Sequence, residues 1–103
     1  MNRITVVGNL TKDAVVDSDK KFTKFTVAET IKRGRDEEVT HYFDVTRFGE
    51  AFMQVADALK KGNQVTVWGK LAVTMREYQG KHYQNLDITA DDVSLPPKEK
   101  APF

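Results

Sequence analysis

Two aromatic side chains fall on the polar side of a predicted β-strand, where they would face solvent. Between Val39 and Phe48 the chain alternates between apolar and polar residues, which is typical of a strand with one buried face. Tyr42 and Phe48 fall on the polar face together with Asp44, whereas a core would take rings on the other face. Six positions separate the two rings, so they stand about 20 Å apart on one side of an extended strand.

Two further rings have polar or basic neighbours. Trp68 stands between Thr66 and Lys70 in a second alternating segment, and Tyr78 lies two positions after Arg76. Exposed rings stack on nucleic acid bases with little regard to sequence, at roughly 1–3 kcal/mol per base, while lysine and arginine bind the phosphates. We therefore interpret all four rings as candidate stacking residues. The basic residues that we expect to contact phosphates are Arg3, Arg33, Arg35, Arg76 and Lys81.

A structural role for the same rings stays open at this point. Each ring could instead cap an end of a barrel or fill an interface between subunits, because a large apolar group is seldom left fully exposed without a function. Trp68 fits either a fourth stacking platform or a contact between subunits, and its polar neighbours lead us to favour the subunit contact.

Residues suited to catalysis are few and scattered. Of the two histidines, His41 lies on the apolar face of its strand and His82 follows a glycine loop, so we interpret the first as structural and the second as exposed. The sequence contains no glycine-rich phosphate loop, no pair of histidines at metal-binding spacing and no nucleophile beside a base. Asp91 and Asp92 are adjacent near a strand end, as in many turns. We expect no enzymatic activity, no cofactor and no metal site.

Composition restricts the class of protein further. The chain has 103 residues, 40% hydrophobic and 30% charged, as expected for one folded domain. A net charge of +1 neither favours nor excludes a polyanionic partner. The absence of cysteine excludes thiol chemistry and fits a reducing compartment. Apolar runs are too short to span a membrane, and strand-like residues begin too early for a signal peptide, so we expect a cytoplasmic protein.

The elements that must position these side chains are mostly strands. Segments rich in β-branched and aromatic residues predict five of them, separated by turns that contain glycine. Gly69, in the middle of the fourth strand, predicts a bulge or a sharp bend. The five predicted strands are Ile4–Val7, Phe22–Ile31, Val39–Phe48, Gln64–Val73 and Tyr83–Val93.

One helix is predicted between the third and fourth strands, bounded by Gly49 and Gly62. Its apolar residues recur at helical spacing from Phe52 to Leu59, and the final glycine suits a left-handed helix end. An all-β chain of five strands with one helix in this place has the element order of the OB-fold, a partly open barrel that binds oligonucleotides or oligosaccharides. A split sandwich with a capping helix would show the same order.

Several segments resemble, in order along the chain, those of bacterial and phage-type single-stranded DNA-binding proteins. Together they extend from residue 1 to about 95, which predicts one OB-fold domain, 1–95, and a short tail, 96–103. The matching segments are Asn2–Asp13, Phe25–Ala28, Phe43–Gly49 with the helix that follows, Val65–Leu71 and Ala90–Val93.

The resemblance implies an OB-fold, usually a homotetramer, that wraps single-stranded DNA over aromatic and basic surfaces. Tyr42 and Phe48 fall where the family places stacking aromatics, and Tyr78 corresponds to a ring in the hairpin between the last two strands. Two positions depart from the family. Ile31 is followed by charge where many members have an aromatic, and Trp68 stands where members commonly have a polar residue, so its role is not inherited.

The tail departs from the family more strongly. Family members carry a long linker and an acidic tip that ends in Pro-Phe and binds partner proteins. Here eight residues reach Pro102 and Phe103, and Lys98 and Lys100 replace the acidity. Without acidic steering, we expect weak or absent recruitment of other proteins through Pro102 and Phe103, the candidate partner-binding tip.

These observations predict a protein that binds single-stranded DNA without strong sequence preference and protects it during replication, recombination or repair. We expect a homo-oligomer, with a tetramer favoured over a dimer, associated with the nucleoid. Three alternatives on the same fold stay open. They are a protein-interaction module, a primosomal accessory protein and a binder of single-stranded RNA, since stacking alone does not distinguish the two nucleic acids.

Overall fold

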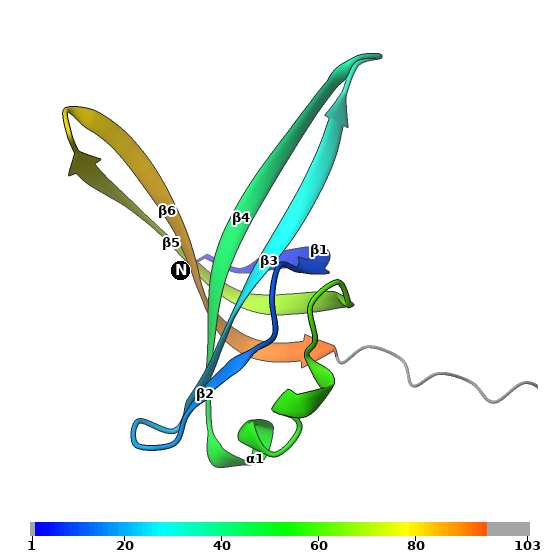
Figure 1. The fold of residues 1–103 in the computed structure, drawn as a ribbon, viewed down its shortest axis with the longest axis vertical. Helices are drawn as coiled ribbons and strands as arrows, with labels where there is room; N and C mark the ends of the chain where they lie inside the picture. Colours follow the sequence, from blue (N-terminus) through cyan, green and yellow to red (C-terminus); the bar gives the residue numbers. More distant parts are fainter. Residues whose placement is uncertain (1, 95–103) are drawn as a thin grey trace, which may run out of the picture.

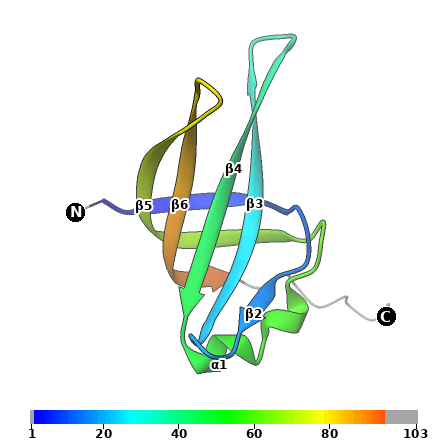
Figure 2. The same ribbon diagram turned by 60° about the vertical axis from the view of Figure 1, so that its left-hand side comes forward.

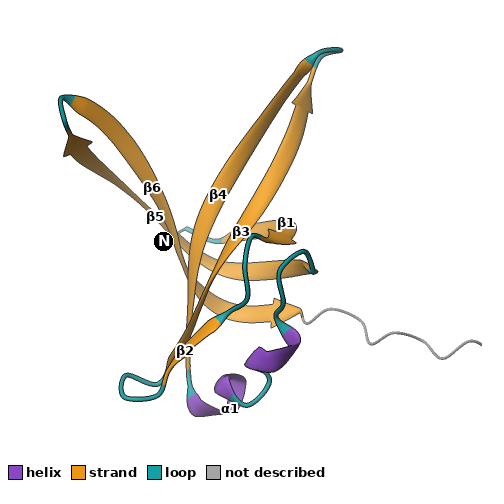
Figure 3. Ribbon diagram, viewed as in Figure 1, coloured by secondary structure: helices purple, strands orange, loops and turns teal. Residues whose placement is uncertain are grey.

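Strands dominate the computed structural model, which describes residues 2–94 (Figures 1 and 3). The elements of the described chain are β1 (Ile4–Leu10), β2 (Val15–Asp17), β3 (Phe22–Arg33), β4 (Glu37–Phe48), α1 (Glu50–Met53), the 3-10 turn η1 (Ala56–Ala58), β5 (Gln64–Tyr78) and β6 (Lys81–Ser94). No helix among these described residues is long and apolar enough to cross a membrane.

Five of these strands close into a barrel. The sheet runs in the order β1-β5-β6-β4-β3-β2, and β1 also pairs with β3, which joins the two ends of the five-stranded ring. The β4–β6 ladder is parallel and the others are antiparallel (Figure 2). The closing β1–β3 ladder contains only two residue pairs, Asn9–Ala28 and Leu10–Val27. The predicted OB-fold is confirmed.

Alternation along the strands fills the barrel with apolar side chains. In β1, β3, β4 and β5 the buried residues are two positions apart, as expected when one face of the pleat points inward, and in β6 a bulge interrupts this spacing between Ala90 and Val93. Leu59, from the segment after α1, is completely buried among them and closes the end of the barrel near that helix. The buried strand residues of the core are Val6, Leu10, Phe25, Val27, Phe43, Val45, Val65, Val67, Ile88, Ala90 and Val93.

Two glycines mark the places where strands approach too closely for a side chain. A Cβ atom on Gly8 would overlap the carbonyl oxygen of Ala28, and one on Gly69 would overlap the carbonyl oxygen of Thr89. Gly69 also adjoins the register shift between β5 and β6, where Trp68 pairs with Asp92 but Gly69 pairs with Ala90. The bulge or bend expected at Gly69 is therefore confirmed. It lets β5 turn sharply around the barrel.

Two long hairpins extend beyond the barrel on the side away from α1 (Figures 1 and 2). One consists of β3 and β4, which pair as far as Arg33 and Glu37, and the other of β5 and β6, which pair as far as Tyr78 and Lys81. The β4–β6 ladder ends at Phe43 and Leu86, and beyond that point the two hairpins diverge. We call the parts beyond this fork the β3–β4 arm and the β5–β6 arm.

The single predicted helix between Gly49 and Gly62 is wrong in extent. The structure has four residues of α-helix and a separate 3-10 turn instead. Gly49, at the start, has φ 121° and offers no capping side chain, and Val55 interrupts the helix with φ −105° and ψ 4°. A helix this short gains little from its own hydrogen bonds, so burial of Ala56 and Leu59 decides the conformation. Gly62 ends the segment with φ 88°, in the expected left-handed conformation.

The strand boundaries also differ from the predicted ones. The short β2, which pairs with the start of β3, was not predicted because three residues carry no recognisable alternation. β5 continues five residues beyond Val73, since both faces of an arm are exposed and neither needs apolar residues. The predicted division into domain 1–95 and tail 96–103 falls at the edge of the described residues and stays a prediction.

Replacing Gly69 by alanine tests the close approach of β5 to β6. The added methyl group would overlap backbone atoms that cannot rotate away, so we expect Gly69→Ala to lower the free energy of unfolding by more than about 2 kcal/mol. Thr74→Ala, on the exposed outer part of β5, is the matched control and should change it by less than about 0.5 kcal/mol. Urea unfolding followed by circular dichroism measures both. Equal midpoints for the two variants would contradict the close approach.

Candidate nucleic-acid interface

One face of the sheet carries most of the exposed rings. Tyr42 and Phe48 alternate with the core residues of β4 and are 60% and 54% exposed. The parallel ladder pairs Asp44 with Asp87, so the odd-numbered residues of β6 from Lys81 to Thr89 point to the same side as Tyr42. Through the β5–β6 ladder, Tyr78 joins them, 62% exposed. We call this surface the outer face; it consists of the β3 and β4 residues that alternate with the core, the odd-numbered β6 residues from Lys81 to Thr89, and the β5 residues that pair with these.

The lower end of the outer face, near α1, contains a pair of phenylalanines. Phe22 on β3 is the register partner of Phe48, and their rings meet edge to face with centroids 5.9 Å apart. The ammonium nitrogen of Lys24 lies 6.0 Å from the centroid of Phe22. The edge-to-face contact holds Phe48 in one orientation while leaving half of it exposed. Phe22 was not predicted as a site residue, although its position on the polar face, opposite in parity to Phe25, indicated one.

Carboxylates occupy the centre of the outer face between Tyr42 and Phe48. Asp44 accepts a hydrogen bond of 3.0 Å from the hydroxyl of Thr26 and is the register partner of Asp87. Both aspartates line a cavity of about 340 Å³ that also touches Lys12 and Lys24. Two carboxylates side by side repel an anion, so a polyanion crossing this face must keep its phosphates away from the centre.

The β5–β6 arm combines rings with cations. Arg76 and Tyr83 are register partners, and the guanidinium carbon lies 5.9 Å from the centroid of the tyrosine ring. Tyr78 and Lys81 form the next outer-face pair toward the tip, where Gln79 and Gly80 make the turn with positive φ. The three predicted residues of this hairpin, Arg76, Tyr78 and Lys81, are thus brought together on one face.

The tip of the β3–β4 arm is electrically balanced. Arg33 pairs in register with Glu37 and Lys32 with Glu38, as cross-strand neighbours of opposite charge. Arg35 and Asp36 complete the tip, which therefore carries as many acidic as basic side chains. The predicted phosphate contacts Arg33 and Arg35 lie far along this arm from Phe48, among carboxylates that offset their charge.

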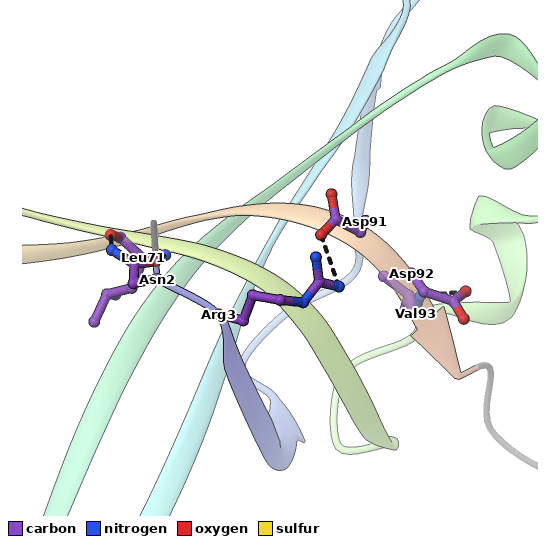
Figure 4. Close-up of polar contacts among 6 residues, drawn as sticks. All are labelled: Asn2, Arg3, Leu71, Asp91, Asp92 and Val93. Carbon is purple, nitrogen blue, oxygen red and sulfur yellow. Dashed lines mark hydrogen bonds and ion pairs between the residues drawn. The ribbon is translucent and has the colours of Figure 1, made fainter.

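Arg3 already has a partner in the structure. Its guanidinium lies 3.2 Å from a carboxylate oxygen of Asp91, the residue left unpaired by the bulge in β6 (Figure 4). Next to it the Asn2 amide donates to the carbonyl of Leu71 at 2.9 Å and accepts from the amide of Leu71 at 2.8 Å. These contacts fasten the start of the chain across β5 and β6. A phosphate at Arg3 would have to compete with Asp91.

Trp68 lies apart from the rings of β4. It is half-buried, and its neighbours across the two ladders are Thr5 of β1 and Asp92 of β6. Ten positions of β5 separate it from Tyr78. Val7, 47% exposed, is diagonal to it on the same side of the β1–β5 ladder. The structure therefore groups Trp68 with an apolar patch near β1, while Tyr42, Phe48 and Tyr78 share the outer face.

No cluster of metal-ligating side chains is present in the part of the chain that the structure describes. Groups of three or more histidine, aspartate or glutamate side chains close enough to hold a metal ion are absent there. His41 lies with its Nδ1 3.6 Å from Glu29 and its ring edge to face with Phe43, and its structural role stays a prediction. Pro102 and Phe103, the predicted partner-binding tip, lie outside the described residues.

Solved structures of similar fold are single-stranded DNA-binding proteins. A small single-stranded DNA-binding protein from Streptomyces coelicolor superposes with a TM-score of 0.75 and 23% identity, over 92% of this chain and 95% of that one. A mitochondrial single-stranded DNA-binding protein from S. cerevisiae gives a TM-score of 0.66 and 22% identity, over 91% of this chain and 93% of that one. At these identities the likeness establishes the fold.

Sequence comparison adds relatives and a family. A single-stranded DNA-binding protein of Aquifex aeolicus is 30% identical over 92% of this chain and 69% of its own length. One from Treponema pallidum is 29% identical over 92% of this chain, which spans only 57% of that relative. The model of the single-strand binding protein family matches residues 1–96. With its barrel, its arms and its whole described length inside that match, the chain belongs to the single-strand binding protein family.

Proposed function

We propose that this protein binds single-stranded DNA on its outer face, without strong sequence preference and without catalysis. The observation that carries the proposal is the gathering of Tyr42, Phe48 and Tyr78, each more than half exposed, on one face of the sheet, while Phe25 and Phe43 are buried in the core. Every base has a flat face that such rings can stack on, so this mode of binding tolerates any sequence.

Phosphate contacts in this proposal come from cations beside the rings. Lys24 adjoins Phe22 and Phe48, while Arg76 and Lys81 adjoin Tyr78. Because Asp44 and Asp87 occupy the centre of the outer face, the DNA backbone passes along the margins of that face and the bases turn toward the sheet. Arg33 and Arg35 contribute less to phosphate binding, because the carboxylates at the tip of the β3–β4 arm offset their charge. Arg3 can bind a phosphate only if its ion pair with Asp91 breaks.

We further propose a homo-oligomer, with a tetramer favoured, that protects exposed strands on the nucleoid during replication, recombination or repair. The half-buried Trp68 and the exposed Val7 support a contact between subunits, because they are diagonal neighbours on the β1–β5 ladder, ten positions of β5 away from Tyr78. Such an arrangement leaves the stacking rings of each subunit accessible.

Affinity for single strands should exceed affinity for duplex and should fall with salt. If Lys24, Arg76 and Lys81 each neutralise one phosphate, the slope of log K against log salt is about −2, at 0.7 per phosphate. Fluorescence anisotropy of a labelled oligothymidine, with duplex and oligouridine of equal length as comparisons, measures this. Equal affinity for duplex would contradict the proposal, and tighter binding of oligouridine would make RNA the ligand. Lys81→Gln should flatten the slope by about 0.7.

Removing the exposed rings should weaken binding and spare the fold. We expect Tyr42→Ala and Phe48→Ala each to reduce the binding free energy by roughly 1–3 kcal/mol. Because both rings are exposed, the free energy of unfolding should change by only about 0.5 kcal/mol. Phe43→Ala, the buried neighbour of Tyr42, is the matched control and should cost about 3–5 kcal/mol of stability. A Tyr42 or Phe48 variant that unfolds like the control would place its ring in the core.

Replacing Trp68 by alanine distinguishes a contact between subunits from a role in base stacking. A subunit contact predicts that the variant has a lower mass by light scattering, while each subunit still binds a short oligonucleotide. An unchanged mass together with weakened binding would instead make Trp68 a stacking residue.

A further inference from the structure

Tyr83 is an exposed ring of the β5–β6 arm that the sequence pattern did not single out. It is 42% exposed and lies directly across the ladder from Arg76, whose guanidinium covers its ring at 5.9 Å. Nothing in the barrel requires a ring at this place, because the arm lies beyond the fork and has no core beneath it.

The register places Tyr83 on the same face as the proposed stacking residues. The parallel ladder fixes Leu86 beside Phe43, so Asn85 falls next to Tyr42 at the fork, and Tyr83 is two positions farther along the arm. Tyr78 follows on the neighbouring strand, opposite Lys81. All three tyrosines of the chain therefore lie on the outer face and follow one another from the fork toward the tip of the arm.

We propose that Tyr83 is a base-stacking residue and that Arg76 covers its ring only in the absence of DNA. This inference rests on the proposed function. A guanidinium over an exposed ring is held more weakly than a stacked base, so a base displaces it. The displaced Arg76 remains on the outer face, within reach of the phosphate of the nucleotide that takes its place. The β5–β6 arm then binds two consecutive bases, on Tyr83 and Tyr78, with Arg76 and Lys81 as the cations.

The alternative is that Tyr83 only supports Arg76 or the hairpin. A double-mutant cycle distinguishes the two roles, because independent contacts to base and phosphate give losses that multiply. If Tyr83 acts only by positioning Arg76, the double variant binds no more weakly than Arg76→Gln alone.

The experiment uses the full chain and a labelled oligothymidine of about 30 nucleotides, long enough to cover one OB-fold. We expect Tyr83→Ala to weaken binding about tenfold, Tyr83→Phe to bind like the parent, and Arg76→Gln with Tyr83→Ala to multiply the single losses. Gln84→Ala, on the opposite face of the same strand, is the matched control and should leave affinity unchanged. Thermal melting of each variant checks the fold.

Photo-cross-linking gives a second readout that a supporting role would not produce. An oligonucleotide that carries 5-iododeoxyuridine should form an adduct on Tyr83 that mass spectrometry locates. Parent-like affinity of Tyr83→Ala, or losses that fail to multiply together with no adduct at Tyr83, would overturn the assignment. Failure of the unchanged protein to bind the oligonucleotide would instead refute the proposed function itself.

Discussion

Closing five strands into a narrow barrel brings backbones together more tightly than side chains allow, and the structure depends on how this crowding is relieved. Gly8 and Gly69 stand where β1 meets β3 and where β5 meets β6, at points where a single methyl group would overlap a carbonyl oxygen. The bulge at Asp91 shifts the alternation of β6, so that Ala90 and Val93 are both buried. Because closure fixes which side of each strand is inside, it also fixes which rings are outside.

The two arms are stabilised differently from the barrel. Beyond the fork each hairpin has two strands and no core, and hairpins of this kind are marginal unless they grow out of a larger sheet. Continuous ladders with β3–β4 and β5–β6 in the barrel supply that support. Freed from packing, the arms can carry rings and charges on both faces. The outer face of the β5–β6 arm carries aromatic rings beside cations, and the tip of the β3–β4 arm carries equal numbers of acidic and basic side chains.

Sequence patterns predicted the barrel well because its determinants are local. Alternation revealed which faces are buried, and it placed Tyr42 and Phe48 correctly outside. The features that the sequence did not predict depend on partners distant in sequence. The contact of Arg3 with Asp91 joins residues 88 positions apart, and the support that Phe22 gives Phe48 depends on a register that no single segment contains. The broken helix and the three-residue β2 are too short for any periodicity to be read.

The strand order has a consequence for how the protein is made. β1 leaves the ribosome before the other strands of the barrel, yet its main partner is β5, and Ile4 pairs with Gly69, 65 positions later. At about 5–20 residues per second, synthesis of the intervening chain takes roughly 3–13 seconds. For that time the apolar face of β1 has only chaperones, solvent or the short ladder with β3 to cover it. The barrel therefore closes only after β5 and β6 have been synthesised, and products truncated before β5 expose an unpaired, aggregation-prone strand.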